Sequence, residues 1–141
     1  MQIINCNTSD YSELAEIWER SVRATHGFLT EDAIEEIKAS LIPDYFPNVN
    51  LYGILNAGSL SGFIGLSGDK IEMLFVDTDK RGQGYGSMLI DFAKAKGAKL
   101  VDVNEQNPSA LQFYKTKGFR IISRDAEDES GRPYPILHLS L

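Results

Sequence analysis

Apolar residues recur at helical spacing in two stretches near the start of the chain. The first stretch runs from Leu14 to Val22 and the second from Ala33 to Leu41. A glycine-containing break at 26–28 separates them. The pattern predicts two consecutive helices, and we expect the second to end at Pro43 and Pro47, because proline cannot continue a helix.

Shorter apolar runs bounded by turn residues predict strands. The pair Ile3-Ile4 opens the chain, and two closing strands are expected around the turn at 128–131. The run from Ile71 to Val76 is apolar except for one acid, which is typical of a buried strand. The internal strands are expected at Asn50 to Leu55, Leu60 to Ser67, Lys70 to Val76 and Lys99 to Val103.

Two further helices complete the expected order of elements. One runs from Ser87 to Lys96 and the other follows Asn107, giving the order β-α-α-β-β-β-α-β-α-β-β. The chain has 141 residues, which is enough for one hydrophobic core but not for two. It has no repeat, linker or low-complexity segment, so we expect a single domain over residues 1–141.

The most informative stretch lies between the strand that ends at Val76 and the helix expected from Ser87. It reads Arg81-Gly-Gln-Gly-Tyr-Gly86, with glycine at alternate positions. Glycine lets the backbone turn tightly and leaves its N–H groups open to a ligand. The following helix directs the positive end of its dipole to the same place. Together these features predict a cradle for a phosphate or pyrophosphate group.

The spacing separates this loop from two common nucleotide-binding motifs. A dinucleotide fold requires Gly-x-Gly-x-x-Gly, but the residue three places after Gly84 is Ser87. A P-loop requires Gly-Lys-Ser/Thr, which the chain lacks. The pattern that remains is Arg/Gln-x-x-Gly-x-Gly/Ala, met by Arg81, Gly84 and Gly86. Alone, this pattern also fits a strand-to-helix turn that binds nothing.

A second motif follows downstream. It reads Asn107-Pro-Ser-Ala-Leu-Gln-Phe-Tyr-Lys-Thr-Lys-Gly-Phe119, in which Asn107 can cap a helix and Gly118 can end it. Val76 to Gly86 followed by Asn-x-x-Ala-x-x-Phe-Tyr-x-x-x-Gly-Phe resembles the acetyl-CoA-binding core of the GCN5-related N-acetyltransferase (GNAT) superfamily. The two motifs in this order are far more specific than either one alone.

The resemblance implies both a fold and an activity. The fold is an α/β (α+β) GNAT fold, with a central mixed, mainly antiparallel sheet of about seven strands flanked by four helices. Its fourth and fifth strands splay apart around the cofactor. The implied activity is an acetyl-CoA-dependent N-acetyltransferase that acetylates a primary amine of a small molecule or peptide by direct attack in a ternary complex. A non-catalytic module that binds or senses acyl-CoA is the alternative, and a Rossmann-type oxidoreductase is a weaker third.

The same resemblance implies the contacts to coenzyme A. Main-chain N–H groups of the glycine loop would hold the pyrophosphate, the end of the fourth strand would pair with the pantetheine arm, and Asn107 would contact that arm by its side chain. The expected cofactor-binding residues are Phe75, Val76, Arg81, Gly82, Gln83, Gly84, Tyr85, Gly86, Ser87, Asn107, Ala110, Phe113 and Tyr114.

Acetyl transfer requires a neutral amine and a proton for the departing thiolate. A lysine amine, with a pKa near ~10.4, is almost entirely charged at pH 7, so a lysine acceptor needs a base. Tyr114 matches the tyrosine that lies beside the CoA sulfur in many family members and is the expected acid; the alternative is a tyrosine that only packs. Asp102 and Glu72 are the candidate bases, and the alternative for each is a solvated strand residue.

The acceptor pocket is expected between the first two helices and the last hairpin. Its expected substrate-binding residues are Thr25, His26, Phe28 and Tyr134. His26 suits substrate binding or proton relay, and equally a helix-end cap. The segments Arg20 to Leu29, Val103 to Asn107 and Gly131 to Leu137 resemble a bacterial subgroup, the YjaB-like acetyltransferases. That resemblance supplies no acceptor.

Composition narrows the partners. The chain has 20 acidic and 14 basic residues, a net charge of −6, which argues against a nucleic-acid partner. No apolar stretch approaches the roughly 18 residues of a membrane span, so we expect a cytoplasmic protein without a membrane partner, monomeric or homodimeric. The single cysteine, Cys6, has no Cys/His partner in the motifs, which argues against an acetyl-enzyme. No metal site is expected.

Overall fold

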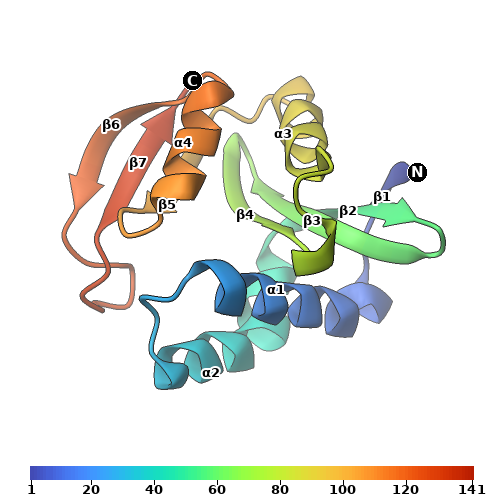
Figure 1. Ribbon diagram of the computed structural model, residues 1–141, viewed down its shortest axis with the longest axis horizontal. Coiled ribbons are helices and arrows are strands. Elements are labelled where there is room, and N and C mark those ends of the chain that lie inside the picture. The colour runs from blue at the N-terminus through green and yellow to red at the C-terminus, as the bar shows by residue number, and fades with distance from the viewer.

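A computed structural model describes residues 1–141, and one seven-stranded sheet forms its centre (Figure 1). The strands are β1 (Gln2–Asn5), β2 (Asn50–Asn56), β3 (Ser59–Ser67), β4 (Lys70–Val76), β5 (Leu100–Asn104), β6 (Arg120–Asp125) and β7 (Ile136–Ser140). The helices are α1 (Tyr11–Thr25), α2 (Glu31–Ser40), α3 (Tyr85–Ala95) and α4 (Pro108–Thr116). The expected order of strands and helices is confirmed.

The sheet is divided into two halves that meet at β4 and β5. Its spatial order is β1-β2-β3-β4-β5-β7-β6, and every pairing is antiparallel except the parallel one between β4 and β5. That parallel pairing covers only Lys70 with Leu100 and Ile71 with Val101. Beyond Ile71 the strands diverge, which confirms the expected fork (Figure 1). The edge of β4 that faces the fork therefore has no strand partner, and its backbone groups are free to pair with an extended ligand.

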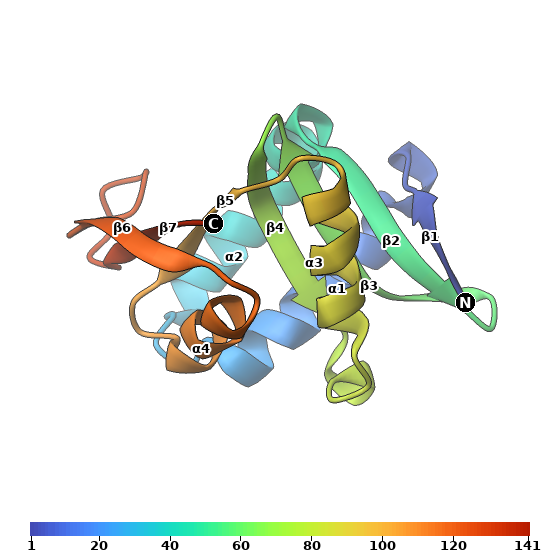
Figure 2. The same ribbon diagram turned by 90° about the horizontal axis from the view of Figure 1, so that it is seen from above.

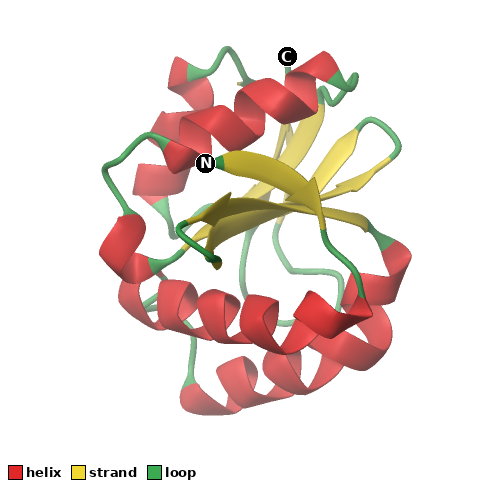
Figure 3. Ribbon diagram, turned by 90° about the vertical axis from the view of Figure 1, so that its right-hand side faces the viewer, coloured by secondary structure: helices red, strands yellow, loops and turns green.

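Helices cover both faces of the sheet (Figure 3). The helices α1 and α2 pack on one face around Trp18 and Phe63, and α3 and α4 pack on the other around Leu89 and Phe119. Seen from above, α3 lies over β2 to β4 and α4 lies beside β5 (Figure 2). None of these helices has the length and apolar character needed to cross a membrane.

The end of α2 differs from the sequence-based expectation. The α-helix α2 ends at Ser40, but helical turns continue through both prolines, as a π-turn at Leu41–Tyr45 and a 3-10 turn at Phe46–Asn48. Leu41 and Phe46 are fully buried and anchor these turns, and Pro47 lies in a first turn, where a backbone N–H is not needed. The expectation that the prolines end the helical segment is therefore wrong.

The helix α3 begins at Tyr85, two residues before the expected start at Ser87. Gly84 is its N-cap and has a left-handed backbone conformation, with φ +84°. The helix therefore begins directly after this glycine.

Arg20 fastens α1 to the loop that follows β4. Its Nε and Nη2 atoms each donate a hydrogen bond of 2.8 Å to the Asp77 carboxylate, which also accepts one from the Thr78 N–H. The hydrogen bond to Arg20 lowers the pKa of Asp77, and the backbone N–H of Thr78 lowers it further. This bidentate pair holds the end of β4, and the glycine loop after it, against α1.

We expect Asp77→Asn to destabilise the protein by about 1–2 kcal/mol, since the carboxylate charge and one of the two oxygens that accept from Arg20 are lost while Arg20, 48% exposed, remains partly screened by water. The folded-state pKa of Asp77 lies below its ordinary value of 3.8, so the stabilisation is present at neutral pH. It is lost as the pH falls through the folded-state pKa. Urea unfolding at about pH 7 and about pH 3 measures this; the difference between wild type and variant should narrow at the lower pH.

The exposed Arg124–Glu105 pair offers a control for this ion pair. Glu105→Gln removes the carboxylate charge from an arginine–carboxylate pair at a solvated site. It should change the free energy of unfolding less than Asp77→Asn does. A gap between wild type and Asp77→Asn that stays constant with pH would contradict a role for the Asp77 charge.

Candidate functional site

A cavity of about 500 Å³ occupies the fork between β4 and β5. Its walls come from the end of β4, the start of α3, the start and middle of α4, and the C-terminal end of α1. Of the thirteen residues expected to bind the cofactor, all but Gln83 line it: Phe75, Val76, Arg81, Gly82, Gly84, Tyr85, Gly86, Ser87, Asn107, Ala110, Phe113 and Tyr114. We call this space the fork cavity.

The glycine loop forms an open backbone cradle at the mouth of the fork cavity. Gly82 and Gly84 have positive φ angles of 78° and 84°, which other residues rarely adopt. A Cβ at either position would meet no protein atom within 4 Å, so the space beside them is open. The first N–H groups of α3 lack helical partners and carry the positive end of the helix dipole. This arrangement fits a phosphate or pyrophosphate group.

Gly86 has a different role from the two glycines before it. It lies inside α3, and a Cβ there would come within 3.4 Å of Phe113 and 3.9 Å of Val76. Its lack of a side chain therefore lets α3 approach the wall formed by α4 and β4. Tyr85 also differs from expectation: its hydroxyl accepts a 2.8 Å hydrogen bond from Asn56 and its ring packs in the core, which leaves mainly its backbone for the cradle.

Tyr114 lies in the wall of the fork cavity with its ring in the core. The ring packs against Phe113 and Phe119 at centroid distances of 5.4 and 5.7 Å, and the residue is 7% exposed. Burial raises the pKa of Tyr114 above its ordinary value of 10, and no hydrogen bond offsets this effect. The phenol therefore keeps its proton at neutral pH, as a proton donor must.

The α1–α2 loop and the β6–β7 loop meet beside the fork cavity. Phe28 packs against both His26 and Tyr134, at 5.3 and 6.1 Å between ring centroids, and Thr25 is hydrogen-bonded to His26. The four expected acceptor residues therefore form one cluster. Only Thr25 and His26 line the fork cavity. Phe28 and Tyr134 line neither large cavity and lie behind His26, where they join the two loops.

The two candidate carboxylate bases lie at the base of the fork. Asp102 accepts from Lys70 Nζ at 2.8 Å through one oxygen and is bonded to His138 Nδ1 at 2.7 Å through the other. Glu72 lies 4.0 Å from the same Lys70 amine. The hydrogen bonds that His138 donates to Asp125 and Asp102 raise the pKa of His138. Both oxygens of Asp102 thus already have hydrogen-bond partners, whereas Glu72 is less tightly held.

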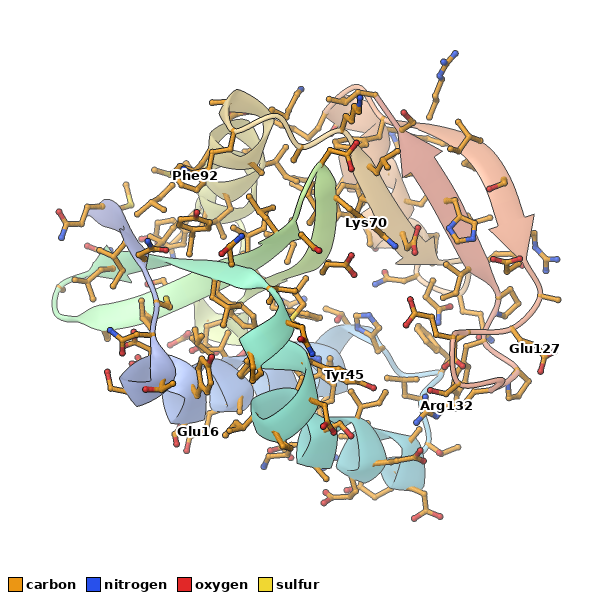
Figure 4. The ribbon with its side chains drawn as sticks, turned by 180° about the vertical axis from the view of Figure 1, so that it is seen from behind. Glu16, Tyr45, Lys70, Phe92, Glu127 and Arg132 are labelled. Atoms are coloured by element: carbon orange, nitrogen blue, oxygen red, sulfur yellow. The ribbon has the colours of Figure 1, made fainter.

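A second cavity, of about 950 Å³, lies on the α1–α2 side of the fork. It shares five residues with the fork cavity, so the two spaces meet between β4 and β5: Ile71, Glu72, Met73, Phe75 and Asp102. Figure 4 shows labelled parts of its wall, with Lys70 near the base of the fork, Tyr45 after α2, and Glu127 and Arg132 in the β6–β7 loop. We call this space the acidic cavity.

Carboxylates make up most of the charged residues in the wall of the acidic cavity. Seven line it, against one lysine and one arginine: Asp44, Glu72, Asp102, Asp125, Glu127, Asp128 and Glu129. Asp44, Glu127 and Glu129 form no ion pair, while Asp128 pairs with Arg132 at 3.3 Å. This cavity could not be predicted from the sequence. The acidic run from Asp125 to Glu129 is the one feature of the sequence that points to it. Folding is what brings this run and the distant Asp44 into the same cavity wall.

Comparisons with known proteins agree with this geometry. The model of the acetyltransferase (GNAT) domain family matches residues 47–121. The peptidyl-lysine N-acetyltransferase YjaB of Salmonella typhimurium is 39% identical, and the match covers 97% of each chain. The solution structure of apo-form YjaB from Escherichia coli superposes with a TM-score of 0.90 at 37% identity, covering 99% of this chain and 95% of that one.

A more distant structure has the same fold. It is the PaiA N-acetyltransferase of Thermoplasma acidophilum in complex with coenzyme A, which superposes with a TM-score of 0.71 at 21% identity over the whole of both chains.

Proposed function

Because this chain belongs to the acetyltransferase (GNAT) family, we propose that it transfers the acetyl group of acetyl-CoA to a lysine side chain of a peptide or protein. Family membership makes it an N-acetyltransferase with acetyl-CoA as the donor. One observation carries the finer proposal: an anion cradle and an acidic cavity open on opposite sides of one fork and meet there.

The donor lies in the fork cavity. The cradle at Gly82 and Gly84, with the first turn of α3 and Arg81, binds the pyrophosphate, since backbone N–H groups and a helix N-terminus favour anions. The unpaired edge of β4 after Ile71 pairs with the pantetheine arm as an added strand would. The thioester then lies between β4 and β5, within reach of Asn107 and Tyr114.

The acceptor enters through the acidic cavity. A lysine ammonium group is attracted by a wall of carboxylates, and its four-carbon stem is long enough to extend from a surface into the fork. Asp44, Glu127 and Glu129, which form no ion pair, are available for basic residues on either side of the lysine. The names of the Salmonella and Escherichia relatives as peptidyl-lysine acetyltransferases agree with this class of acceptor.

The transfer is a direct attack. The neutral lysine nitrogen bonds to the thioester carbonyl carbon, the C–S bond breaks, and the Tyr114 phenol donates its proton to the departing thiolate. An acetyl-cysteine intermediate is not needed: Cys6 lines neither cavity, and burial, with Asp10 and Glu13 nearby, raises its pKa to about 11, so it is a thiol at pH 7.

Peptides with a blocked N-terminus and one central lysine test the proposal. We expect mass spectrometry to find one acetyl group on that lysine, formed faster when the flanking residues are arginine than when they are glutamate, because the acidic cavity repels the latter. A peptide with arginine in place of the lysine should remain unmodified. Acetylation of polyamines or amino acids but of no peptide would contradict the proposal and show that the acceptor is a small molecule.

The double variant Glu127→Gln, Glu129→Gln tests the part played by the acidic cavity. It should reduce the preference for arginine flanks about 3- to 10-fold, mainly through KM, since each rim charge contributes only a fraction of a kcal/mol to about 1 kcal/mol. Glu16→Gln is the matched control, because Glu16 lies on the exposed side of α1 and lines neither cavity (Figure 4). An unchanged preference in the double variant would contradict the role of this wall.

A further inference from the structure

His26 is held in one tautomer by a chain of hydrogen bonds. The Thr25 hydroxyl lies 2.7 Å from the Ser21 carbonyl oxygen and 2.7 Å from His26 Nδ1. A hydroxyl has one proton, and the carbonyl can only accept, so Thr25 donates to Ser21. Nδ1 must then carry the proton that Thr25 accepts. The other ring nitrogen, Nε2, is then unprotonated and carries the lone pair of the ring.

That lone pair is directed toward the fork cavity. Nε2 lies 3.5 Å from the side-chain nitrogen of Asn107, a donor at the start of α4 that also lines this cavity. On its other sides the ring packs against Phe28 and against Phe75 of β4, at 5.3 and 6.5 Å between centroids. The imidazole is thus held by its hydrogen bond with Thr25 and by contacts with two aromatic rings, with its basic nitrogen at the cavity.

The surroundings of His26 keep the ring neutral. None of the side chains that contact it, from its own loop, from β4 or from α4, carries a charge. Burial alone lowers the pKa of His26 below its ordinary value of 6.5. The other titratable residues that line the same cavity form no hydrogen bond with the ring: Glu72, Lys80, Arg81, Tyr85, Asp102 and Tyr114.

We propose that His26 is the general base of the acetyl transfer, taking a proton from the acceptor nitrogen through Nε2. This inference rests on the proposed lysine acceptor, whose ammonium form must lose a proton before it can attack. Of the two candidate carboxylates, Asp102 has both oxygens bound to Lys70 and His138, and Glu72 lies 4.0 Å from the Lys70 amine. His26 Nε2 makes only the long contact with Asn107.

The protons balance over the whole step. The lysine ammonium loses one proton to Nε2, directly or through one water, and the neutral amine attacks the carbonyl carbon. The tetrahedral adduct loses its second N–H proton to solvent as the C–S bond breaks, and Tyr114 donates to the thiolate and is reprotonated from solvent. His26, now an imidazolium, releases its proton to solvent before the next turnover. The net products are acetyl-lysine, CoA thiol and one proton.

The pH dependence of kcat/KM for the lysine peptide tests the assignment. In wild type the rate should fall as the pH drops through the folded-state pKa of His26, which burial holds below the ordinary value of 6.5, because protonated His26 cannot accept a proton. His26→Gln should lose about 10- to 100-fold at pH 7.5 and should lose that acidic limb. His138→Asn, which removes the other of the two histidines, should keep the limb. A His26→Gln enzyme that retains the wild-type limb would overturn the proposal.

Two further readouts separate chemistry from structure. Imidazole in solution should restore part of the rate to His26→Ala, which a purely structural role would not allow. Thr25→Val should lower kcat because Nδ1–H loses its acceptor, whereas Thr25→Ser should keep most of it. Equal rates in the two Thr25 variants, or no rescue by imidazole, would count against the base. If wild type acetylates no lysine peptide, the proposed acceptor fails instead, and the same variants then test the base with whichever amine is turned over.

Discussion

Replacing Gly84 with valine is expected to abolish CoA binding while the fold survives. No protein atom lies within 4 Å of a Cβ at this position, so the new side chain would occupy the open space of the cradle rather than collide with the core. Valine also disfavours the φ of +84°, which would shift the N–H groups that face the anion. Losing two charge-assisted hydrogen bonds, each contributing about 1.5–3 kcal/mol, should weaken CoA binding at least about 100-fold in a calorimetric titration.

The chain offers a matched control for this substitution. Gly58, in the turn between β2 and β3, has a φ of +82° and equally open space around its Cβ position, but it lines neither cavity. Gly58→Val therefore carries the same backbone strain without entering the cradle. It should lower thermal stability by a similar amount and leave CoA affinity unchanged. Unchanged affinity in Gly84→Val would place the pyrophosphate elsewhere.

Tyr114→Phe should separate chemistry from binding. The ring and its packing against Phe113 and Phe119 are kept, so CoA affinity should change little. The buried hydroxyl has no hydrogen bond to lose, so stability should not fall. Without the phenol proton, the departing thiolate must be protonated by water, and kcat should fall about 10- to 1,000-fold.

Steady-state kinetics with a lysine peptide, beside calorimetric titration with CoA, measures both effects of Tyr114→Phe. Tyr52→Phe is the control, since Tyr52 packs on Phe92 and lines neither cavity. A Tyr114→Phe enzyme with wild-type kcat would leave Tyr114 as a packing residue only.

Local rules explain why the cradle could be predicted from sequence. The alternation of glycines, the helix that follows and the Asn107 cap are features of short segments, and the structure has Gly84 as the N-cap of α3 and Asn107 as the N-cap of α4. The fork could be predicted only from the family resemblance. Periodicity indicates where strands lie, but not that two neighbouring strands stop pairing partway along their length. The two-residue pairing of β4 with β5 depends on how the two halves of the sheet pack.

Features that depend on long-range register could not be predicted. Asp102 stands opposite His138 because β5 pairs with β7, strands more than thirty residues apart in sequence, and Lys70 joins them only through the short β4–β5 pairing. Considered alone, Asp102 is a strand carboxylate with no visible partner, which made it a reasonable candidate base. The acidic cavity has the same origin, since Asp44 and Glu127 share a wall only in the folded protein.

If donor and acceptor reach the fork from opposite cavities, a crystal structure with a bisubstrate conjugate will show both at once. The conjugate would join the CoA sulfur, through an acetyl spacer, to the lysine side chain of an arginine-flanked peptide. We predict the pantetheine arm along β4 in the fork cavity, the peptide in the acidic cavity beside Glu127, and the CoA sulfur within about 6 Å of the Tyr114 hydroxyl, a span that one water can bridge. A peptide that leaves on the same side as the pantetheine arm would rule out entry through the acidic cavity, and a sulfur farther from Tyr114 would rule out Tyr114 as the proton donor.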